Sequence, residues 1–224
     1  MKTNSFDHVA LWVNDPQAIA DFLDPLEGMH VIEQTGDFTL IGGDAREGKL
    51  TLFVAEGERS PGVVGRIVLR VPDLDQALAA LDGADVQRRG GEARFTGPEG
   101  IPFGLVEDAD ASLCDLDTLV LRVTDPEAVK AGLATLGLDP DDDGLRLANR
   151  RVVLESGSPP AGEPLLNHIA LLIDSGEEGL EEVRRRGLEV TAIKDTENTF
   201  AFFIAGPEQI SIEYVEHKPT FSLT

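Results

Sequence analysis

The 224-residue sequence contains a single cysteine, Cys114, and no long apolar run. One cysteine cannot form an internal disulfide, and it cannot supply a thiolate metal cluster. No stretch approaches the ~20 consecutive apolar residues that a membrane-spanning helix needs. The first residues, MKTNSFDHV, lack the apolar segment of a signal peptide. We therefore expect a cytoplasmic protein that does not span a membrane.

Basic residues are also scarce, because 19 lysines and arginines stand against 41 aspartates and glutamates, for a formal net charge of −22. A surface this negative repels nucleic acids and anionic lipid headgroups. The run Arg184–Arg186 ends the segment GEEGLEEVRRRG, whose acids come first and whose bases come last. That order is typical of a helix with charges matched to its dipole. We expect a small-molecule partner and neither a nucleic-acid nor a membrane partner.

What the sequence does contain is one unit repeated four times. Each copy opens with an apolar strand, passes a turn into about three turns of amphipathic helix, and reaches a glycine that ends the helix. Short alternating runs follow, such as HVIEQTG, FTLIGG and KLTLFVAE in the first copy. The opening segments are FDHVALWVNDPQAIADFLDPLEGM, VGRIVLRVPDLDQALAALDGADV, LDTLVLRVTDPEAVKAGLATLGLD and LNHIALLIDSGEEGLEEVRRRGLEV. The candidate N-caps are Asn14 or Asp15, Asp73, Thr124 or Asp125, and Asp174 or Ser175, and the helix-ending glycines are Gly28, Gly83, Gly137 and Gly187.

Each copy is a βαβββ module of about 50–55 residues. The pattern predicts an α+β protein of four tandem βαβββ modules, which form two domains with curved mixed sheets. We expect residues 1–110 to hold modules one and two, and residues 111–224 to hold modules three and four.

Three features together resemble the vicinal oxygen chelate superfamily: the tandem modules, a histidine in the opening strands of the first and last copies, and the closing segment GPEQISIEYVE. That superfamily includes glyoxalase I, bleomycin-resistance proteins, methylmalonyl-CoA epimerase and the type I extradiol dioxygenases. The resemblance covers essentially the whole chain. It implies glyoxalase-like domains, with metal ligands drawn from the first and last strands of the modules. It does not specify the reaction, because this scaffold carries many chemistries.

The resemblance also implies which residues bind the metal. The first strands place His8 in module one and His168 in module four, and alignment of the last strands on their closing acid adds Glu213. The corresponding residues of the other modules are Arg66 and Thr118 in the first strands, and Phe53, Gly104 and Glu155 in the last strands. We therefore predict a metal cleft between modules one and four.

Two histidines and one carboxylate with open positions form the ligand set of non-haem Fe(II) oxygenases. Fe(II) is the expected metal, with Mn(II), Zn(II) and Ni(II) as alternatives. A histidine in an apolar strand can instead be a core residue bonded to the backbone, and the matched positions of His8 and His168 favour metal binding over that alternative. For His30 and for His217, which we place in the C-terminal tail, we predict structural roles.

Three functions remain open. The ligand set is similar to that of hydroquinone-type ring-cleaving dioxygenases, which implies cleavage of a small catechol- or hydroquinone-like aromatic with O₂. That family has a tyrosine and an upstream histidine where this chain has Phe203 and residues 194–196.

A glyoxalase- or epimerase-type lyase or isomerase uses a fourth ligand, which Phe53 cannot supply. A non-catalytic resistance-type protein would bind an aromatic molecule. In each case we expect Trp12, Phe53 and Phe203 in the substrate pocket, in a monomer or homodimer.

Overall fold

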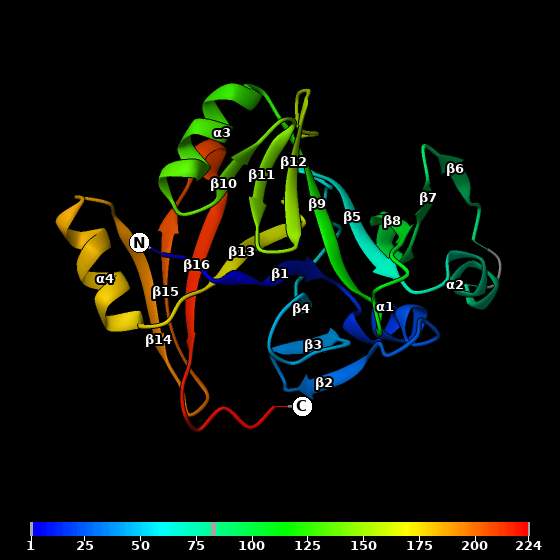
Figure 1. Cartoon of the computed structure of the whole chain (residues 1–224), viewed down its shortest axis with the longest axis horizontal. Coiled ribbons are helices and arrows are strands. Elements are labelled where there is room, and N and C mark those ends of the chain that lie inside the picture. Colours follow the sequence, from blue (N-terminus) through cyan, green and yellow to red (C-terminus); the bar gives the residue numbers. More distant parts are fainter. Residues whose placement is uncertain (1, 82–83, 224) are drawn as a thin grey trace.

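The computed structural model describes residues 2–81 and 84–223, and it contains two eight-stranded mixed sheets (Figure 1). The predicted α+β fold of four βαβββ modules is confirmed. In the first sheet the strand order is β14-β15-β16-β13-β1-β4-β3-β2, and in the second it is β10-β11-β12-β9-β5-β8-β7-β6. Among the described residues, no helix has both the length and the apolar character needed to span a membrane.

Every module has the expected order of one strand, one helix and three strands. Module one comprises β1 (Ser5–Val13), α1 (Pro16–Leu23), β2 (His30–Gln34), β3 (Phe38–Gly42) and β4 (Lys49–Val54). Module two comprises β5 (Val64–Val71), α2 (Leu74–Ala80), β6 (Gln87–Arg89), β7 (Glu92–Thr96) and β8 (Pro102–Glu107). Module three comprises β9 (Asp115–Val123), α3 (Pro126–Thr135), β10 (Asp139–Asp141), β11 (Gly144–Leu147) and β12 (Arg150–Ser156). Module four comprises β13 (Leu166–Leu172), α4 (Gly176–Arg185), β14 (Val190–Asp195), β15 (Thr199–Ala205) and β16 (Ser211–His217).

A short polar side chain starts each helix by accepting a backbone N–H from three residues further along. Where the sequence left two candidates, the structure selects the second. The four N-caps are Asp15, Asp73, Asp125 and Ser175. Gly137 and Gly187 directly follow the C-cap residues of α3 and α4, with φ values of 103° and 70° that glycine tolerates without strain. The prediction for module one was wrong, because α1 already ends at Leu23 and Gly28, with a φ of 86°, lies in the loop beyond it. Gly83 lies outside the described residues.

The sheets join modules that are not consecutive in the chain. Module one shares the first sheet with module four, through antiparallel pairing of β1 with β13, and modules two and three share the second sheet through β5 and β9. In Figure 1, β1 and β13 run side by side near the centre of the molecule. Modules one and two are in contact outside the sheets, where Glu99 accepts hydrogen bonds from the backbone N–H groups of Asn14 and Asp15. The division into residues 1–110 and 111–224 stays a prediction.

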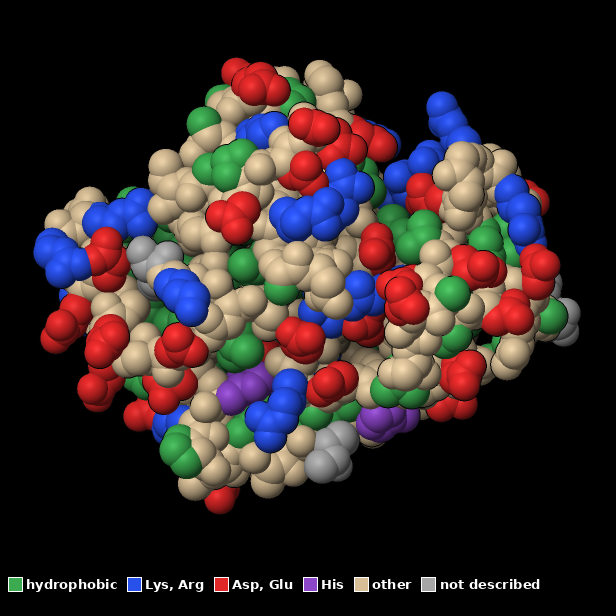
Figure 2. Space-filling model, in the orientation of Figure 1, with side chains coloured by type: hydrophobic (Ala, Val, Ile, Leu, Met, Phe, Trp, Pro, Cys, Tyr) green, Lys and Arg blue, Asp and Glu red, His purple; other side chains and the backbone are tan. Residues whose placement is uncertain are grey.

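Acidic side chains are spread over the visible face of the molecule, with basic side chains scattered between them (Figure 2). Most of the large apolar side chains among the described residues are buried in one core that residues of both sheets form, and Cys114 is a free thiol within it. On the visible face the acidic side chains do not gather into a single patch.

Candidate metal centre

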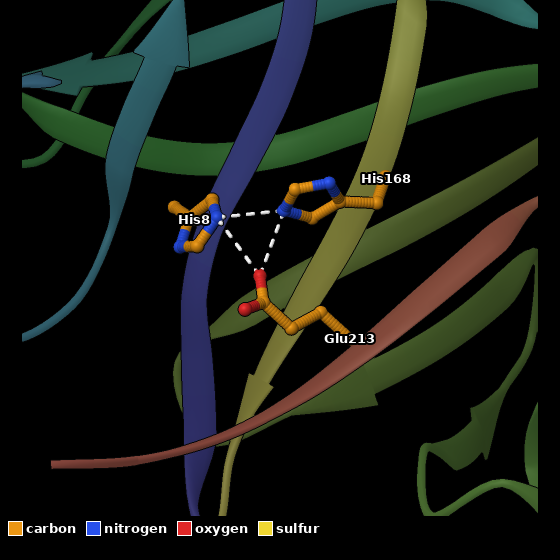
Figure 3. A group of neighbouring side chains, drawn as sticks. All are labelled: His8, His168 and Glu213. Carbon is orange, nitrogen blue, oxygen red and sulfur yellow. Dashed lines mark hydrogen bonds and ion pairs between the residues drawn. The ribbon is translucent and has the colours of Figure 1, made fainter. Parts of the chain in front are cut away.

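Side chains from three neighbouring strands converge on one point of the first sheet (Figure 3). His8 Nε2 on β1 lies 2.9 Å from His168 Nε2 on β13. Glu213 Oε2 on β16 lies 2.7 Å from His168 Nε2 and 3.3 Å from His8 Nε2. All three ligand atoms lie within 4.8 Å of one another. The structure thus brings together the three residues that the sequence singled out, and their binding of a metal remains a prediction.

The strand register explains why residues so distant in the chain meet. His8 is paired with Ala170, and Ala10 is paired with His168, so the two histidines are related by a local twofold axis. Ala170 is in turn paired with Glu213 on the parallel strand β16. Because side chains alternate between the two faces of a sheet, this register puts all three ligand candidates on the same face.

Neighbouring oxygen atoms orient both imidazole rings. His8 Nδ1 lies 2.6 Å from Asp7 Oδ1, and His168 Nδ1 lies 3.0 Å from Asn167 Oδ1. These oxygens can only accept, so each Nδ1 donates a hydrogen bond and each neutral ring presents the Nε2 lone pair to the centre. Two such nitrogens and a carboxylate oxygen are suitable ligands for a divalent transition metal, and an acceptor bonded to the outer nitrogen is usual for a metal-binding histidine.

The electrostatics of the site favour a positive charge at its centre. Burial alone would lower the pKa of His8, but hydrogen bonds to Asp7 and Glu213 outweigh burial and raise that pKa to about 9. Burial would raise the pKa of Glu213, yet its contacts with His168 and His8 lower that pKa to about 2. At His168 burial dominates and lowers the pKa. At neutral pH the metal-free centre therefore holds the ionised carboxylate of Glu213 and an extra proton on His8. A metal cation would replace that proton.

Asp7 links the centre to Lys49 and His217. Its carboxylate is buried, with Oδ1 3.0 Å from Lys49 Nζ and Oδ2 2.7 Å from His217 Nε2. Burial would raise the pKa of Asp7, but the charge of Lys49 and the contacts with His217 and His8 hold it well below its usual value. This network keeps a negative charge beside His8 and so holds the His8 ring in place.

Sequence reasoning missed this network. His217 was placed in the C-terminal tail, and that was wrong, since it is the last residue of β16. It lies four residues after Glu213, so period-two alternation along the strand could have placed both on the same face. Asp7 is a charged residue inside an apolar strand, and that is the signal that could have identified it, whereas Lys49 is the first residue of its strand and follows a polar loop.

The sequence alignment of the last strands was wrong by two residues in module one. The twofold relation makes Ala10 the equivalent of Ala170, and Ala10 is paired with Thr51, so Thr51 and not Phe53 occupies the position that Glu213 has in module four. The side chain of Thr51 is buried, and its Oγ has no hydrogen-bond partner in the described part of the chain. A hydroxyl therefore stands where a fourth ligand would be.

Module three shows the same offset. Thr118 on β9 is the equivalent of His168, and the residue two positions on, Val120, is paired with Val153. Glu155 lies two residues beyond that position and is within 3.8 Å of Arg66. A shift by two residues keeps a side chain on the same face, which is why alternation in the sequence did not reveal the error. In the second sheet Arg66 is ion-paired with Glu92, and no ligand set converges there among the described residues.

The three candidate ligands lie in the wall of a cavity of about 410 Å³. Phe203 and Phe53 also line it, with ring centroids 5.1 Å and 6.1 Å from that of His168. Trp12 is not among the lining residues in the described part of the chain, and its ring packs against Phe53 at 5.6 Å. Of the three aromatic residues expected in the pocket, two face the cavity and Trp12 supports one of them.

Comparison with solved structures supports the fold. A putative dioxygenase from Bacillus subtilis subsp. subtilis str. 168 superimposes with a TM-score of 0.77 at 20% identity, over 98% of this chain and 87% of that one. Glyoxalase I from Zea mays gives a TM-score of 0.71 at 17% identity, over 95% of this chain and 92% of that one. The cppA protein from Streptococcus pneumoniae TIGR4 gives 0.64 at 12% identity, over 96% and 100%. At these identities the similarity shows a shared fold and does not show a shared reaction.

No curated protein matches the sequence significantly. Residues 5–110 match the family model described as "Glyoxalase/Bleomycin resistance protein/Dioxygenase superfamily". Modules three and four repeat the same architecture beyond the matched region. Residues 5–110, slightly less than half of the 224 residues, therefore match the glyoxalase/bleomycin resistance protein/dioxygenase superfamily, also called the vicinal oxygen chelate superfamily, and the chain shares its fold with glyoxalase I from Zea mays.

Proposed function

We propose that this chain is a metal-dependent dioxygenase that opens the ring of a small catechol- or hydroquinone-like aromatic. His8, His168 and Glu213 bind the metal, with Fe(II) as the first choice and Mn(II), Zn(II) or Ni(II) as alternatives. The observation that carries the proposal is the convergence of two imidazole nitrogens and one carboxylate oxygen within 4.8 Å, on the wall of a cavity. Three protein ligands leave open positions for two vicinal oxygens of a substrate and for O₂.

When bound, the metal would supply Lewis acidity and redox chemistry towards O₂. The chain supplies positioning. Asp7 and Asn167 hold the two imidazole rings in the orientation that exposes Nε2. Phe53 and Phe203 give the cavity apolar walls that suit an aromatic ring and exclude water.

Proton transfer needs a group other than the tyrosine and histidine that similar ring-cleaving enzymes have. Phe203 cannot transfer a proton, and its backbone is paired with Glu213 at the centre of the site. His217 lines the cavity, and its Nε2 lies beside Asp7. We assign the acid–base role that this tyrosine and histidine have to the His217 imidazole, which can hold a proton at Nε2.

The two other functions fit the site less well. A glyoxalase- or epimerase-type reaction moves a proton with a fourth, carboxylate ligand, and the structure has Thr51 at that position. A binding protein without a metal has no need for two imidazoles, one buried and one partly buried, that are directed at a carboxylate. The ligand geometry therefore supports metal-dependent oxygenation over both alternatives.

Elemental mass spectrometry on anaerobically purified protein tests the metal, and O₂ uptake with catechols and hydroquinones tests the reaction. We expect about one equivalent of iron or manganese per chain, as a single three-ligand site implies, and O₂ consumption with at least one substrate of this class. Zinc or nickel without O₂ uptake would favour the isomerase. Failure to bind any of the four metals after reconstitution would refute the proposal.

A further inference from the structure

Lys194 is a cation at the mouth of the cavity whose role the proposed reaction does not explain. It lies on β14 and lines the cavity together with the candidate metal ligands. Its Nζ is 5.6 Å from the ring centroid of Phe53 and 5.5 Å from that of Phe203. These rings belong to modules one and four, so the ammonium stands where the two modules meet around the cavity. Contacts with two aromatic faces favour a cation at this point.

The charge of Lys194 is not neutralised by a carboxylate. The chain has 41 acidic residues, yet Lys194 forms no ion pair within the described residues. The other lysine of the cavity, Lys49, is paired with Asp7. Glu33 and Glu197 also line the cavity, and neither forms an ion pair with Lys194. The aromatic rings hold the ammonium without using its N–H donors, which remain available to a ligand.

The cavity has a cation at its mouth, a candidate metal centre in its wall and apolar rings between them. This arrangement favours a molecule with an anionic group at one end and metal-binding oxygens at the other. We propose that the substrate carries a carboxylate that Lys194 binds, while its vicinal oxygens face His8, His168 and Glu213. The aromatic ring of the substrate lies against Phe53 and Phe203. The proposed substrates are therefore small aromatic acids with adjacent hydroxyl groups. This inference rests on the proposed metal site and adds the charge of the substrate to it.

Binding of a matched pair of probes to the Mn(II)-loaded protein tests the inference without turnover. Catechol and 3,4-dihydroxybenzoate share the chelating group and differ in the carboxylate, and their Kd values are measured anaerobically by calorimetry. 3,4-Dihydroxyphenylacetate, whose carboxylate reaches further, covers a longer distance to Lys194. We expect at least one acid to bind about 10–100-fold more tightly than catechol, the range for a hydrogen bond to a charged group.

Variants assign that preference to Lys194. Lys194→Met should abolish the preference for the acid and leave the Kd of catechol unchanged, whereas Lys194→Arg should keep most of the preference. Lys2→Met is the matched control, because it removes the same charge from an exposed lysine that does not line the cavity. Lys194 is exposed and forms no hydrogen bond within residues 2–81 and 84–223, so its loss should not unfold the protein.

The outcomes separate this inference from the proposed function. Equal binding of catechol and both acids to the wild type, or a preference that survives in Lys194→Met, would overturn the role of Lys194 and leave the metal site standing. Failure of all three probes to bind the metal-loaded protein would overturn the proposed function and the inference together.

Discussion

Metal binding should release one proton from the centre at neutral pH. Because the pKa of metal-free His8 is raised to about 9, its imidazole is protonated at pH 7, and a metal ion must displace that proton. Glu213, with a pKa of about 2, is already ionised. The pKa of His168 is lowered from 6.5, so it is already neutral. His8 is therefore the one ligand that exchanges a proton in this range.

The size of the effect follows from the difference between pKa and pH. A proton and the metal ion compete for His8, and at pH 7 its pKa of about 9 lies two pH units above the pH. This competition weakens the apparent affinity for the metal about 100-fold, or by about 3 kcal/mol. The apparent Kd should fall about tenfold per pH unit as the pH rises towards 9, and should level off above it. Between pH 7.0 and 8.5 the expected improvement is about 25-fold.

Titration calorimetry with Mn(II) under anaerobic conditions measures this directly. Experiments in HEPES and Tris, which differ in ionisation enthalpy, count the protons released, and we expect about one per metal ion at pH 7. Asp7→Asn removes the negative charge that raises the pKa of His8, so this variant should release less than one proton and show a weaker pH dependence. Release of no proton, or of two, by the wild type would refute the protonation states derived from the structure.

Three further predictions concern the same centre. His168→Ala and Glu213→Ala should abolish Mn(II) binding while the circular dichroism spectrum stays native. Glu155→Ala removes a carboxylate outside the centre and should leave metal content unchanged. Loss of metal in Glu155→Ala would show that the wrong modules were paired. Thr51→Glu should add a fourth ligand and tighten Mn(II) binding about tenfold or more, equivalent to about 1.4 kcal/mol, and an unchanged Kd would contradict the strand register of the centre. Urea unfolding of the metal-free protein should give the highest stability near pH 6.5. Protonation of His8 stabilises the fold fully below pH 6.5, and this is lost as the pH rises through about 9. Neutral His168, whose pKa is lowered by burial, stabilises the fold above pH 6.5, and this is lost as the pH falls below that value. Ionised Glu213 stabilises it above pH 4.5, and this is lost as the pH falls through about 2, so a stability maximum near pH 9 would contradict these shifts.

The candidate ligands could be found from the sequence because each one breaks a strong local pattern. His8, His168 and Glu213 are polar residues inside otherwise apolar strands, and two of them occupy matched positions of a repeat. The helix starts were equally clear, since short polar side chains precede each amphipathic segment. Such features depend on a few neighbouring residues, so they can be read without knowledge of the rest of the fold.

The register of the parallel strands could not be found in this way. Phe53 and Thr51 are two residues apart, so either one at the position that Glu213 has in module four puts a side chain on the correct face of the sheet. The alternation of inward and outward side chains is the same for both registers. The network around Asp7 was missed for a related reason. Lys49 and His217 come from strands on either side of the central pair, and no local pattern connects them.

Local sequence thus specified the repeated βαβββ module, the position of each helix, and the polar residues directed into one face of a sheet, because these follow from short-range periodicity. Long-range strand pairing specified the rest. Antiparallel contact between β1 and β13 joined module one to module four and brought Lys194 over rings from two modules. The parallel register of β1 with β4 set Thr51 at the fourth position. Hydrogen bonds between strands can form in several registers with the same alternation, so the choice among them depends on packing of the complete core.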